Sequence, residues 1–356
     1  MKRKTMCLWA ALWRQMVVVV MFAVGCMTAI ARGTTISVLQ WNIWQEGTMI
    51  EGGYDAIVDE IVRLKPDFVT FSEVRNYHNT RFCDRITQSL RERGETYWSF
   101  YSYDTGLLSR HPINDSITVF PCVDDHGSIY GLRAEVEGKK VAVYTAHLDY
   151  LHDSYYEARG YDGSSFQPIT VVSDPDILIA HGNLSMRDEA IAAFLRQAEK
   201  DAAEGYAVLI GGDMNEPSHR DWTTATKDLY DHHGAVVAWP QTTALEAAGF
   251  CDAYRTKYPN VLTHPGFTYP SDNPDADVSR LTWAPAADER DRIDYVFFRS
   301  SSEVRLRLKD CRIFGPKGCI KNSERYTEST ADSYLLPLGT WPTDHKGVWT
   351  TFRLGR

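Results

Sequence analysis

Five short clusters of polar residues could carry out hydrolytic chemistry. Their central residues are Asn42, Glu73, His147, the pair Asp213 and Asn215, and the late set Asp294, Asp344 and His345. Carboxylate and amide oxygens suit Mg²⁺, which keeps several of its waters and needs few protein ligands. Carboxylates and imidazoles can also orient a water molecule and move its protons. These residue types therefore favour metal-assisted hydrolysis of an ester.

Each cluster also has an ordinary structural interpretation when it is considered alone. Asn42 and the Gly-Asp-x-Asn run at 212–215 are typical of turns, and Asp344 after a nearby proline is typical of an Asx turn. Glu73 fits a solvated strand end, and His147 fits a hydrogen-bonded core histidine. A shared site is favoured because all the clusters occur in one chain and most of them close or follow an apolar strand.

The elements that must position these residues can be predicted from the spacing of the apolar side chains. Residues 36–41 alternate with the period of two that is typical of a strand, and residues 54–64 repeat at a helical spacing and stop before Pro66. The same two patterns recur in further segments, with strands at 67–71, 140–146, 207–211 and 293–298 and an amphipathic helix at 186–203. Because active sites usually lie where strand ends meet, the polar clusters should converge at one rim of a sheet.

The arrangement of strands buried under helices predicts the fold class. Helices on both outer faces imply an α+β fold in a single domain. We expect a four-layer α/β/β/α sandwich, in which two packed mixed sheets are flanked by helices.

The clusters and their order resemble those of the endonuclease/exonuclease/phosphatase superfamily. The resemblance extends from about residue 36 to residue 352, and it includes the segments 65–73 and 105–113. Gly-Asp-x-Asn together with a terminal Thr-Asp-His is specific in combination, and the run 145–149 is similar to that of secreted bacterial members. The resemblance implies a catalytic domain over residues 34–354.

The resemblance also implies roles for the metal-binding and water-activating residues. Asn42, Glu73 and Asp344 are the expected ligands of Mg²⁺, with Mn²⁺ as the alternative cation. Asp213 is similar to the carboxylate that orients or deprotonates the attacking water, and Asn215 would fix that geometry or hold a phosphate oxygen. Hydrolysis of a phosphoester needs both functions, because charge on the phosphoryl oxygens must be neutralised while water is activated.

Two histidines of the pattern are expected to contact the scissile phosphate from either side. They are His147 and His345, and by the resemblance Asp294 pairs with His345 and favours its charged imidazolium form. Arg187, which opens a helix, is a further candidate for a phosphate contact. The alternative for Arg187 is an exposed residue at a helix start, because arginines are mostly exposed.

Two long segments between the motifs should set the substrate. Residues 150–185 follow the strand of His147 directly, so they should overhang the site. Within them, Tyr150 and Tyr155 are candidates for stacking on a base, sugar or inositol ring. A packed loop without any ligand role is the alternative. Residues 254–287 carry further aromatic side chains and should form the opposite wall.

The N-terminus has the composition of an export signal. A basic start precedes the apolar stretch 16–31, which is shorter than the ~20 residues that span a bilayer, and Ala29-Ile30-Ala31 offers a cleavage site. We therefore expect a signal peptide at 1–31 and a secreted or periplasmic protein. A retained membrane anchor, or a lipid anchor at Cys26 that would give an outer-surface lipoprotein, is the alternative.

The charge balance bears on the substrate. The chain has 38 basic and 47 acidic residues, and four of the basic ones lie before residue 32, which leaves 34 against 47 and a net charge of −13 for the remainder. A domain with this net negative charge does not attract nucleic acid through its overall charge. The sequence thus favours an exported Mg²⁺-dependent phosphoesterase that hydrolyses a phosphodiester or phosphomonoester of a small molecule. No stable protein partner is implied.

Three other functions are compatible with parts of the pattern. A secreted endonuclease or exonuclease acting on DNA or RNA would share the whole site. A non-catalytic binding protein on the same fold should have lost site residues, and here all the expected positions are present. A two-carboxylate glycosidase would not need paired histidines. Dependence on a metal ion separates these classes.

Overall fold

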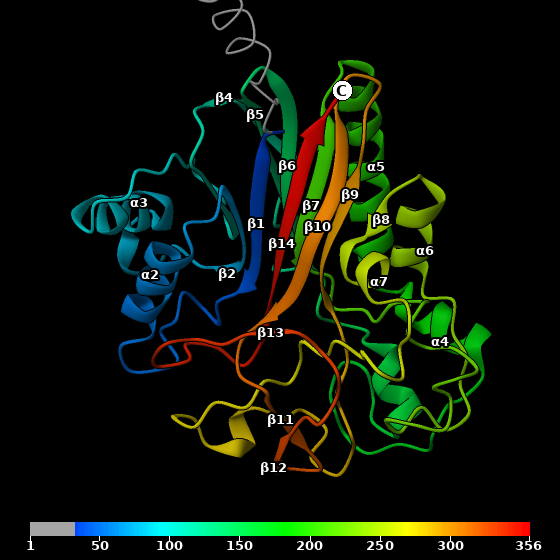
Figure 1. Cartoon of the computed structure of the whole chain (residues 1–356). Coiled ribbons are helices and arrows are strands. Elements are labelled where there is room, and N and C mark those ends of the chain that lie inside the picture. The colour runs from blue at the N-terminus through cyan, green and yellow to red at the C-terminus, as the bar shows by residue number, and fades with distance from the viewer. Residues whose placement is uncertain (1–32) are drawn as a thin grey trace, which may run out of the picture. The chain divides into compact units, whose positions relative to one another are not determined.

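Two six-stranded sheets pack face to face and form the centre of the fold (Figure 1). The computed structural model describes residues 33–356, so the expected signal peptide at 1–31 and Cys26 lie outside the described residues. The first sheet has the strand order β13-β10-β14-β1-β2-β3, and the second has the order β4-β5-β6-β7-β9-β8. Each sheet contains both parallel and antiparallel pairs, which confirms the predicted mixed sheets.

The strands range from two to ten residues in length. Those of the first sheet are β1 (Thr35–Asn42), β2 (Phe68–Val74), β3 (Asp104–Ser109), β10 (Arg305–Phe314), β13 (Tyr334–Leu335) and β14 (Gly347–Gly355). Those of the second sheet are β4 (Ile113–Phe120), β5 (Gly127–Val136), β6 (Lys139–Leu148), β7 (Ala207–Asp213), β8 (Cys251–Asp252) and β9 (Asp294–Arg299). A separate hairpin pairs β11 (Gly318–Lys321) with β12 (Glu324–Thr327).

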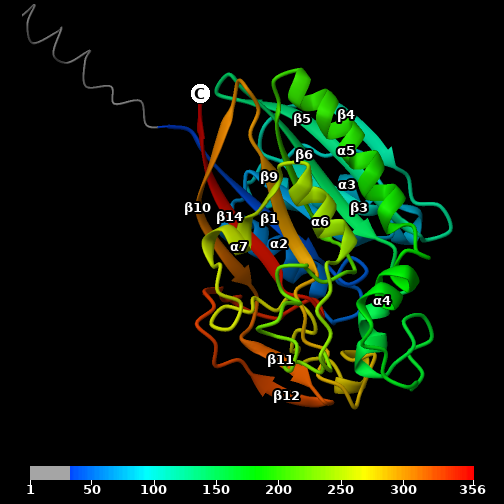
Figure 2. The same ribbon diagram turned by 90° about the vertical axis from the view of Figure 1, so that its right-hand side faces the viewer.

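Helices cover the outer face of each sheet, as the two views show (Figures 1 and 2). On the first sheet these are α2 (Gly53–Leu64) and α3 (Phe82–Glu92), and on the second they are α5 (Arg187–Ala203) and α6 (Pro240–Ala247). Shorter helices lie in the connections: α4 (Pro175–Gly182), α7 (Ala253–Lys257), η1 (Tyr77–Asn79), η2 (Ser154–Arg159) and η3 (Val278–Arg280). The four-layer sandwich is therefore confirmed.

The alternation of side chains along β1 explains how a core strand also reaches the site. Ile36 and Val38 are fully buried between the two sheets, whereas Trp41 points to the other face and packs under α2 and α3. Because successive side chains of a strand point to opposite faces, Gln40 and Asn42 follow Ile36 and Val38 on the inner face. The apolar inner face of β1 thus ends in two polar side chains.

The predicted helices and their ends follow from local chemistry. The expected helix at 54–64 is α2, and it ends at Lys65, whose left-handed backbone (φ 50°) precedes a proline. The expected helix at 186–203 is α5, which buries four apolar side chains against the second sheet, namely Ala190, Ile191, Phe194 and Ala198. Burial of an aromatic side chain such as Phe194 stabilises the fold by about 2 kcal/mol. Within residues 33–356, no helix is both long enough and apolar enough to cross a membrane.

Candidate active site

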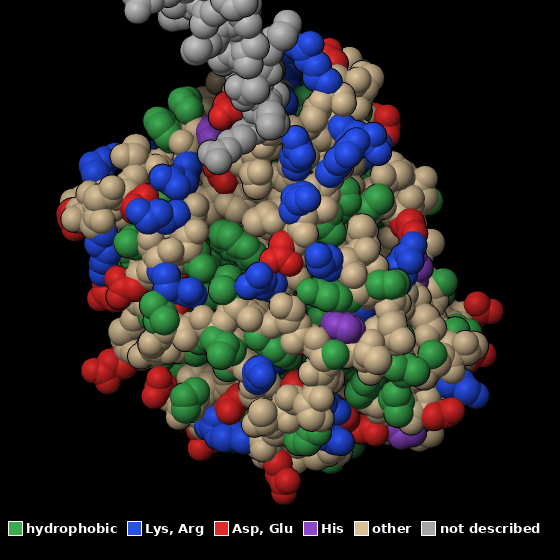
Figure 3. Space-filling view, in the orientation of Figure 1, with side chains coloured by type: hydrophobic (Ala, Val, Ile, Leu, Met, Phe, Trp, Pro, Cys, Tyr) green, Lys and Arg blue, Asp and Glu red, His purple; other side chains and the backbone are tan. Residues whose placement is uncertain are grey.

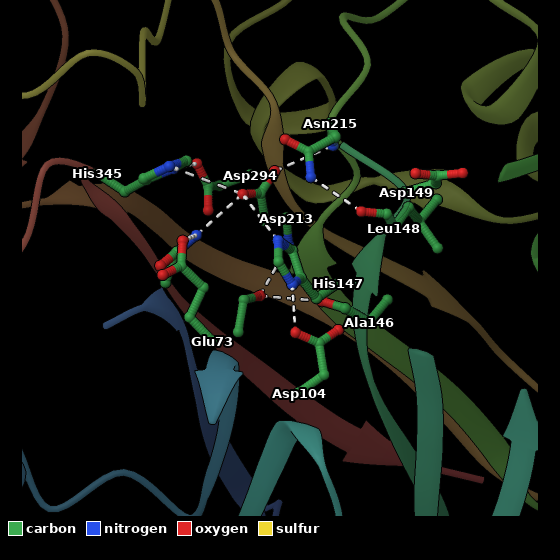
Figure 4. A network of polar contacts seen from close by, with 12 residues as sticks. Glu73, Asp104, Ala146, His147, Leu148, Asp149, Asp213, Asn215, Asp294 and His345 are labelled. Atoms are coloured by element: carbon green, nitrogen blue, oxygen red, sulfur yellow. Dashed lines mark hydrogen bonds and ion pairs between the residues drawn. The ribbon is translucent and has the colours of Figure 1, made fainter. Parts of the chain in front are cut away.

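One row of the second sheet holds three of the residues singled out in the sequence. The strand register places His147 of β6 beside Asp213 of β7, and Asp213 beside Asp294 of β9. In the first sheet, Asn42 ends β1 and Glu73 lies near the end of the neighbouring strand β2. The face-to-face packing of the sheets brings these strand ends together (Figure 4).

Asp213 lies at the centre of the group. Its Oδ2 accepts a hydrogen bond from Asn42 Nδ2 at 3.0 Å, and it lies 3.7 Å from Nε2 of His345 and 4.0 Å from Nε2 of His147. Its Oδ1 accepts a hydrogen bond from the backbone N–H of Asn215 at 3.0 Å. The buried carboxylate of Asp213 thus lies between two imidazoles. The backbone N–H of Asn215 fixes its orientation.

The glycines before Asp213 allow β7 to approach its neighbours closely. A Cβ atom at Gly211 would lie 2.4 Å from Oγ1 of Thr70 in the facing sheet, and one at Gly212 would lie 2.3 Å from the carbonyl oxygen of Ala146. Any side chain at either position would separate Asp213 from the facing strands. The Gly-Gly-Asp sequence is therefore required by the packing around the carboxylate.

Asn215 is held in a left-handed turn immediately after β7. Its φ is 46°, a conformation that asparagine tolerates better than most residues, and its Nδ2 donates to the carbonyl oxygen of Leu148 at 2.9 Å. The residue therefore ties the end of β6 to the end of β7. Its backbone N–H also holds the Asp213 carboxylate, at 3.0 Å.

Each histidine is oriented by its own carboxylate. Nδ1 of His345 donates to Oδ2 of Asp294 at 2.9 Å, the pairing that the family resemblance implied. Nδ1 of His147 donates in the same way to Oδ1 of Asp104 at 2.8 Å. Because Nδ1 is occupied in both rings, both Nε2 atoms are left to face Asp213 (Figure 4).

Asp104 lies in none of the motifs that mark the other site residues in the sequence. The residue opens β3 with a left-handed backbone (φ 65°), directly before the segment 105–113 that resembles the family pattern. It is also held by Ser128, which donates to Oδ2 at 3.2 Å, and by Arg75, whose Nη1 lies 3.1 Å from Oδ1. An aspartate at the start of a strand gives no signal of a partner on another strand.

The carboxylate partners keep both imidazoles charged at neutral pH. Burial alone would lower the pKa of His147, but Asp104, followed by Asp213, outweighs it and raises the pKa to about 9. Burial is likewise outweighed at His345, where Asp294 and then Asp213 raise the pKa to about 10. For Asp213, burial and then the charge of Asp294 raise the pKa to about 6, against the opposing effect of the two imidazoliums. Between about pH 7 and pH 8, an ionised carboxylate therefore lies between two cations.

Glu73 reaches the site because the strand is irregular at this point. The pairing of β2 with β3 shifts register across Glu73, which leaves it as a bulge residue with a φ of 67°. Its Oε1 accepts from Asn42 Nδ2 at 3.0 Å, and its Oε2 accepts from the backbone N–H of Gln45 at 2.9 Å. The bulge therefore turns a carboxylate out of the ladder and into the site.

The donor set around Glu73 fits a hard divalent cation. Asp344 also lines the cavity, and burial raises its pKa to about 7, opposed by His345 and reinforced by the charge of Glu73. Within residues 33–356, neither Glu73 nor Asp344 forms an ion pair with a lysine or arginine. Glu73 is half-buried and Asp344 is buried, and a bound cation would relieve the repulsion between the two carboxylates. These carboxylate oxygens suit Mg²⁺. The expected ligand role of Asn42 does not fit, because its Nδ2 faces Glu73 and its Oδ1 accepts from the backbone N–H of Trp44 at 3.0 Å.

The ligand atoms of Asp213, Asp294 and His345 lie close together, but their arrangement is better explained without a metal ion. Single ligand atoms of Asp213, Asp294 and His345 all lie within 4.8 Å of one another. Asp294 and His345 are hydrogen-bonded to each other, however, and Gln40 donates to the other oxygen of Asp294 at 2.9 Å. The oxygens of Asp294 are therefore engaged in orienting the imidazole.

A cavity of about 720 Å³ is lined by six of the polar residues described above, namely Glu73, His147, Asp213, Asn215, Asp344 and His345. The segment 150–166 and the segment from 269 to 283 provide its walls, as expected for both long loops. An aromatic row runs outward through Tyr155, Tyr156, Phe166 and Trp283, with successive ring centroids 4.7, 5.0 and 5.1 Å apart. Across the cavity, the guanidinium of Arg280 lies 5.1 Å from the ring of Trp44.

The two tyrosines that the sequence proposed as substrate contacts both line this cavity. Tyr150 is 42% exposed and free to stack on a ligand, whereas Tyr155 is only 3% exposed and its ring belongs to a packed cluster with Trp222 and Trp239. The segment 150–185 therefore combines the two alternatives that the sequence left open. Part of it forms a packed lobe, and part of it forms the wall of the cavity.

Arg187 does not occupy the position that the sequence suggested. It is neither an exposed helix-start residue nor part of the cavity wall, because its side chain is 1% exposed under the segment that follows β6. Its Nη1 donates to Oδ1 of Asp153 at 2.8 Å and to the carbonyl oxygen of Asp149 at 2.7 Å, and its Nη2 donates to the carbonyl oxygen of His152 at 2.8 Å. The guanidinium thus positions the loop and is not directed at a substrate phosphate.

Comparison with known proteins identifies one matching family over most of the chain. The sequence model described as "Endonuclease/Exonuclease/phosphatase family" matches residues 39–345. A Caenorhabditis elegans protein, the uncharacterized protein F14F9.5, is 27% identical over 347 residues, which cover 95% of this chain and 98% of the nematode protein. This relative does not support the narrower likeness to secreted bacterial members.

Solved structures show the same fold. The humanized D. rerio TDP2 with 14 mutations is 19% identical, with a TM-score of 0.52, over 90% of this chain and 99% of that one. D. rerio TDP2 complexed with a single-strand DNA product is 17% identical, with a TM-score of 0.51, over the same shares of the two chains. At these identities the likeness concerns the arrangement of sheets and helices.

Proposed function

The chain belongs to the endonuclease/exonuclease/phosphatase family, and from this premise we propose that it is a metal-dependent phosphoric ester hydrolase in which water attacks the phosphorus. One observation carries the proposal. A buried carboxylate, Asp213, lies between the Nε2 atoms of His147 and His345 at 4.0 and 3.7 Å, beside the carboxylates of Glu73 and Asp344. This arrangement combines a proton acceptor, two cationic donors and oxygen ligands in one cavity.

The residues have distinct roles in the proposed reaction. Asp213 accepts a proton from the attacking water, since its carboxylate is ionised at neutral pH and fixed by Asn215. The Nε2–H groups of His147 and His345 donate hydrogen bonds to phosphoryl oxygens, whose negative charge develops during the reaction. Asp294 holds the ring of His345 and keeps it charged.

Glu73 and Asp344 are the proposed ligands of the cation, which is Mg²⁺ or alternatively Mn²⁺, whereas the amide oxygen of Asn42 is engaged by the backbone N–H of Trp44. Bound there, the cation would neutralise charge on the phosphoryl group and the leaving oxygen. In the structure Asn42 also donates to both Glu73 and Asp213, so it links the ligand set to the carboxylate that activates water.

We favour a small phosphorylated substrate, a phosphodiester or phosphomonoester that carries a ring. The aromatic row and Tyr150 offer stacking surfaces, and the cavity volume of about 720 Å³ suits a ligand of limited size. The lysines and arginines on the face seen in Figure 3 gather over β10 and β14, whose exposed basic residues include Arg305, Arg307 and Arg353. The basic residues that line the cavity are Arg75 and Arg280, and the net charge of −13 after residue 31 disfavours a nuclease acting on duplex DNA.

A nuclease acting on DNA or RNA remains the second candidate. It is favoured by D. rerio TDP2, whose structure was determined with a single-strand DNA product. Stacking of successive bases on the aromatic row would serve such a substrate as well. The two candidates are compared by kcat/KM on a single-stranded oligonucleotide and on a small aryl diester. A preference above about tenfold for the oligonucleotide would favour the nuclease, and the opposite preference would favour the small substrate.

We also propose export, because residues 1–31 have the composition of a signal peptide. A secreted or periplasmic protein with a catalytic domain over 34–354 would then result, or an outer-surface lipoprotein if Cys26 carries a lipid. Mass spectrometry of the protein from cell fractions tests this. A soluble product beginning at residue 32 indicates cleavage, and a lipidated product beginning at Cys26 indicates anchoring.

The proposed activity is tested with a panel of phosphoesters and two site variants. We expect the wild-type protein to hydrolyse an aryl phosphodiester with Mg²⁺ and to stop in EDTA. Asp213→Ala and His345→Ala should each lower kcat by on the order of 10²-fold or more. The control is His219→Ala, since His219 pairs with Glu246 outside the cavity and should leave kcat unchanged. Full turnover in the Asp213 variant, or no hydrolysis of any ester by folded wild-type protein, would refute the proposal.

A further inference from the structure

The hydroxyl group of Tyr269 is buried in the wall of the cavity without a partner. The side chain is 5% exposed, and its hydroxyl oxygen forms no hydrogen bond with any described residue. Among the residues that line the cavity, no other has a buried polar side-chain atom without a hydrogen bond. An unsatisfied buried hydroxyl is unfavourable, so its presence in a functional site calls for a ligand atom that completes it.

The position of this hydroxyl is fixed by the chain around it. Tyr269 exchanges backbone hydrogen bonds with Asp291, at 3.1 and 2.9 Å. Asp291 is itself held by an ion pair with Arg159 at 2.7 Å and by the indole N–H of Trp222 at 3.1 Å. The ring also packs against the ring of His345, with centroids 4.8 Å apart. The ring that carries the hydroxyl is therefore held against the imidazole that faces Asp213.

The surroundings make the hydroxyl a hydrogen-bond donor. Burial, and after it the negative charges of Glu289 and Asp344, raise the pKa of Tyr269 well above its usual value, so the group keeps its proton. These carboxylates lie near the hydroxyl, but none of them accepts a hydrogen bond from it. A donor available in this position suits an anionic oxygen of a ligand bound beside His345.

We propose that the Tyr269 hydroxyl donates a hydrogen bond to a non-bridging oxygen of the bound phosphoryl group, on the His345 side of Asp213. The inference rests on the proposed function and adds a catalytic residue that neither motif nor spacing singled out. The hydrogen bond strengthens as charge accumulates on the phosphoryl oxygens, so it contributes more to the transition state than to substrate binding.

The test compares Tyr269→Phe with a matched control. Tyr334→Phe also removes a phenolic hydroxyl, but Tyr334 lies on β13, outside the cavity. We expect Tyr269→Phe to lower kcat/KM by about 10- to 100-fold, mainly in kcat, and to weaken inhibition by inorganic phosphate and orthovanadate. Tyr334→Phe should leave kcat/KM and both inhibition constants unchanged.

Two further measurements separate this role from a structural one. Loss of an unsatisfied buried hydroxyl should leave the thermal stability of Tyr269→Phe equal to or above that of the wild type, whereas a structural hydroxyl would make the variant less stable. The loss of rate should be the same for p-nitrophenyl and alkyl esters. A loss confined to alkyl esters would overturn the assignment to a non-bridging oxygen, because it would place the donor at the leaving oxygen.

The outcomes also distinguish this inference from the proposed function. If the wild-type protein hydrolyses no ester, the proposed function fails, whatever the effect of Tyr269→Phe. If the wild-type protein is active and Tyr269→Phe retains its kcat/KM and its inhibition by phosphate, the role of Tyr269 alone is refuted.

Discussion

The two imidazoles of the site are held in the same way by carboxylates from different strands. Asp104 serves His147, and Asp294 serves His345, at nearly equal distances of 2.8 and 2.9 Å. Each carboxylate selects which ring nitrogen faces Asp213, and each keeps its imidazole charged. Single substitutions can therefore test whether the positive charge is needed for turnover.

We expect Asp104→Asn to lower kcat by about tenfold or more at pH 8 and by less at pH 6. Asp104 raises the pKa of His147 to about 9 against the effect of burial. Without the carboxylate, burial lowers this pKa, so the imidazolium is lost at a lower pH and the alkaline limb of the rate profile moves down. The profile of kcat against pH checks this.

The matched control is Asp125→Asn. Asp125 pairs with Arg75, as Asp104 does, but it does not contact His147. In the profile of kcat against pH, the alkaline limb of Asp125→Asn should coincide with that of the wild type. An unchanged limb in Asp104→Asn would contradict the role of the imidazolium at His147.

Glu216 directly follows Asn215, and its side chain is buried. Burial raises the pKa of Glu216 to about 7, opposed by Arg187 and by the backbone N–H of Gln241, which donates to it at 3.0 Å. The native state therefore binds this proton more tightly than the unfolded state does. The resulting stability is present below about pH 4.5 and is lost as the pH rises through 7.

Glu216→Gln should remove this dependence, because an amide stays neutral at every pH. Relative to the wild type, its free energy of unfolding should rise between pH 5 and pH 8 by on the order of 2 kcal/mol. Urea unfolding at the two pH values measures the change, with Glu324→Gln on the exposed strand β12 as the control. A constant difference between Glu216→Gln and the wild type would show that Glu216 is ionised in the native protein throughout.

Residue types, and the pairing of Asp294 with His345, could be predicted from the sequence where a motif carries them, whereas the other partners could not. Asp213, Asn215 and His345 stand in short motifs whose order is distinctive, and the structure brings them together. Asp104 and Tyr269 have no such signal. Their importance arises from contacts with residues far away in the chain, which only the folded structure reveals.

At the scale of elements, Arg187 joins the start of α5 to the segment that follows β6. Its guanidinium donates to the carbonyl oxygens of Asp149 and His152 and pairs with Asp153. Arg187→Met should therefore lower the free energy of unfolding by about 3 kcal/mol, because it leaves Asp153 buried without its partner. Urea unfolding measures the loss.

A double substitution provides the control for Arg187. Arg187→Met combined with Asp153→Asn removes both charges, so much of the lost stability should return. Burial already raises the pKa of Asp153 well above its usual value, with Arg187 opposing. The single variant should therefore be less destabilised at pH 5 than at pH 8, since the lone carboxyl can take up a proton. No recovery in the double variant would indicate that the contacts of Arg187 with backbone carbonyls dominate.

The aromatic row is contributed by two loops, and it can be tested without disturbing the reaction centre. Trp283 is 57% exposed and stacks on Phe166 at the outer end of the row. Trp283→Ala should raise KM for ring-bearing esters by about tenfold, with little change in kcat. Methyl phosphodiesters provide the control substrate. Equal changes for both kinds of ester would show that the row does not bind a ring.

Regular elements were easier to predict than the loops between them. The period of two in β1 and the helical spacing in α2 and α5 reflect burial against a sheet, which the sequence records directly. The course of residues 150–185 depends on ion pairs such as Arg159 with Asp291, whose members lie 132 positions apart. The sequence therefore placed this segment over the site but did not predict which of its side chains would be buried.

For the whole molecule, the carboxylates of the site couple metal binding to stability. Glu73, Asp213 and Asp344 lie close together in the native state, and a bound cation relieves their repulsion. Mg²⁺ at about 100 times its Kd should therefore raise the free energy of unfolding by about 2.7 kcal/mol. Calorimetry with and without EDTA measures the effect. Glu73→Gln should abolish it, and equal stabilisation of this variant would place the cation elsewhere.

The course of the first sheet has a practical consequence. Thr35 at the start of β1 pairs with Arg353 near the end of β14, whereas Asn42 at the other end of β1 donates to Asp213, which lines the cavity. Seven residues of strand separate the two ends of β1 by about 23 Å. A fusion partner or sensor chip attached behind Arg356 would therefore hold the protein with its cavity facing the solution, open to every ligand of the binding experiments.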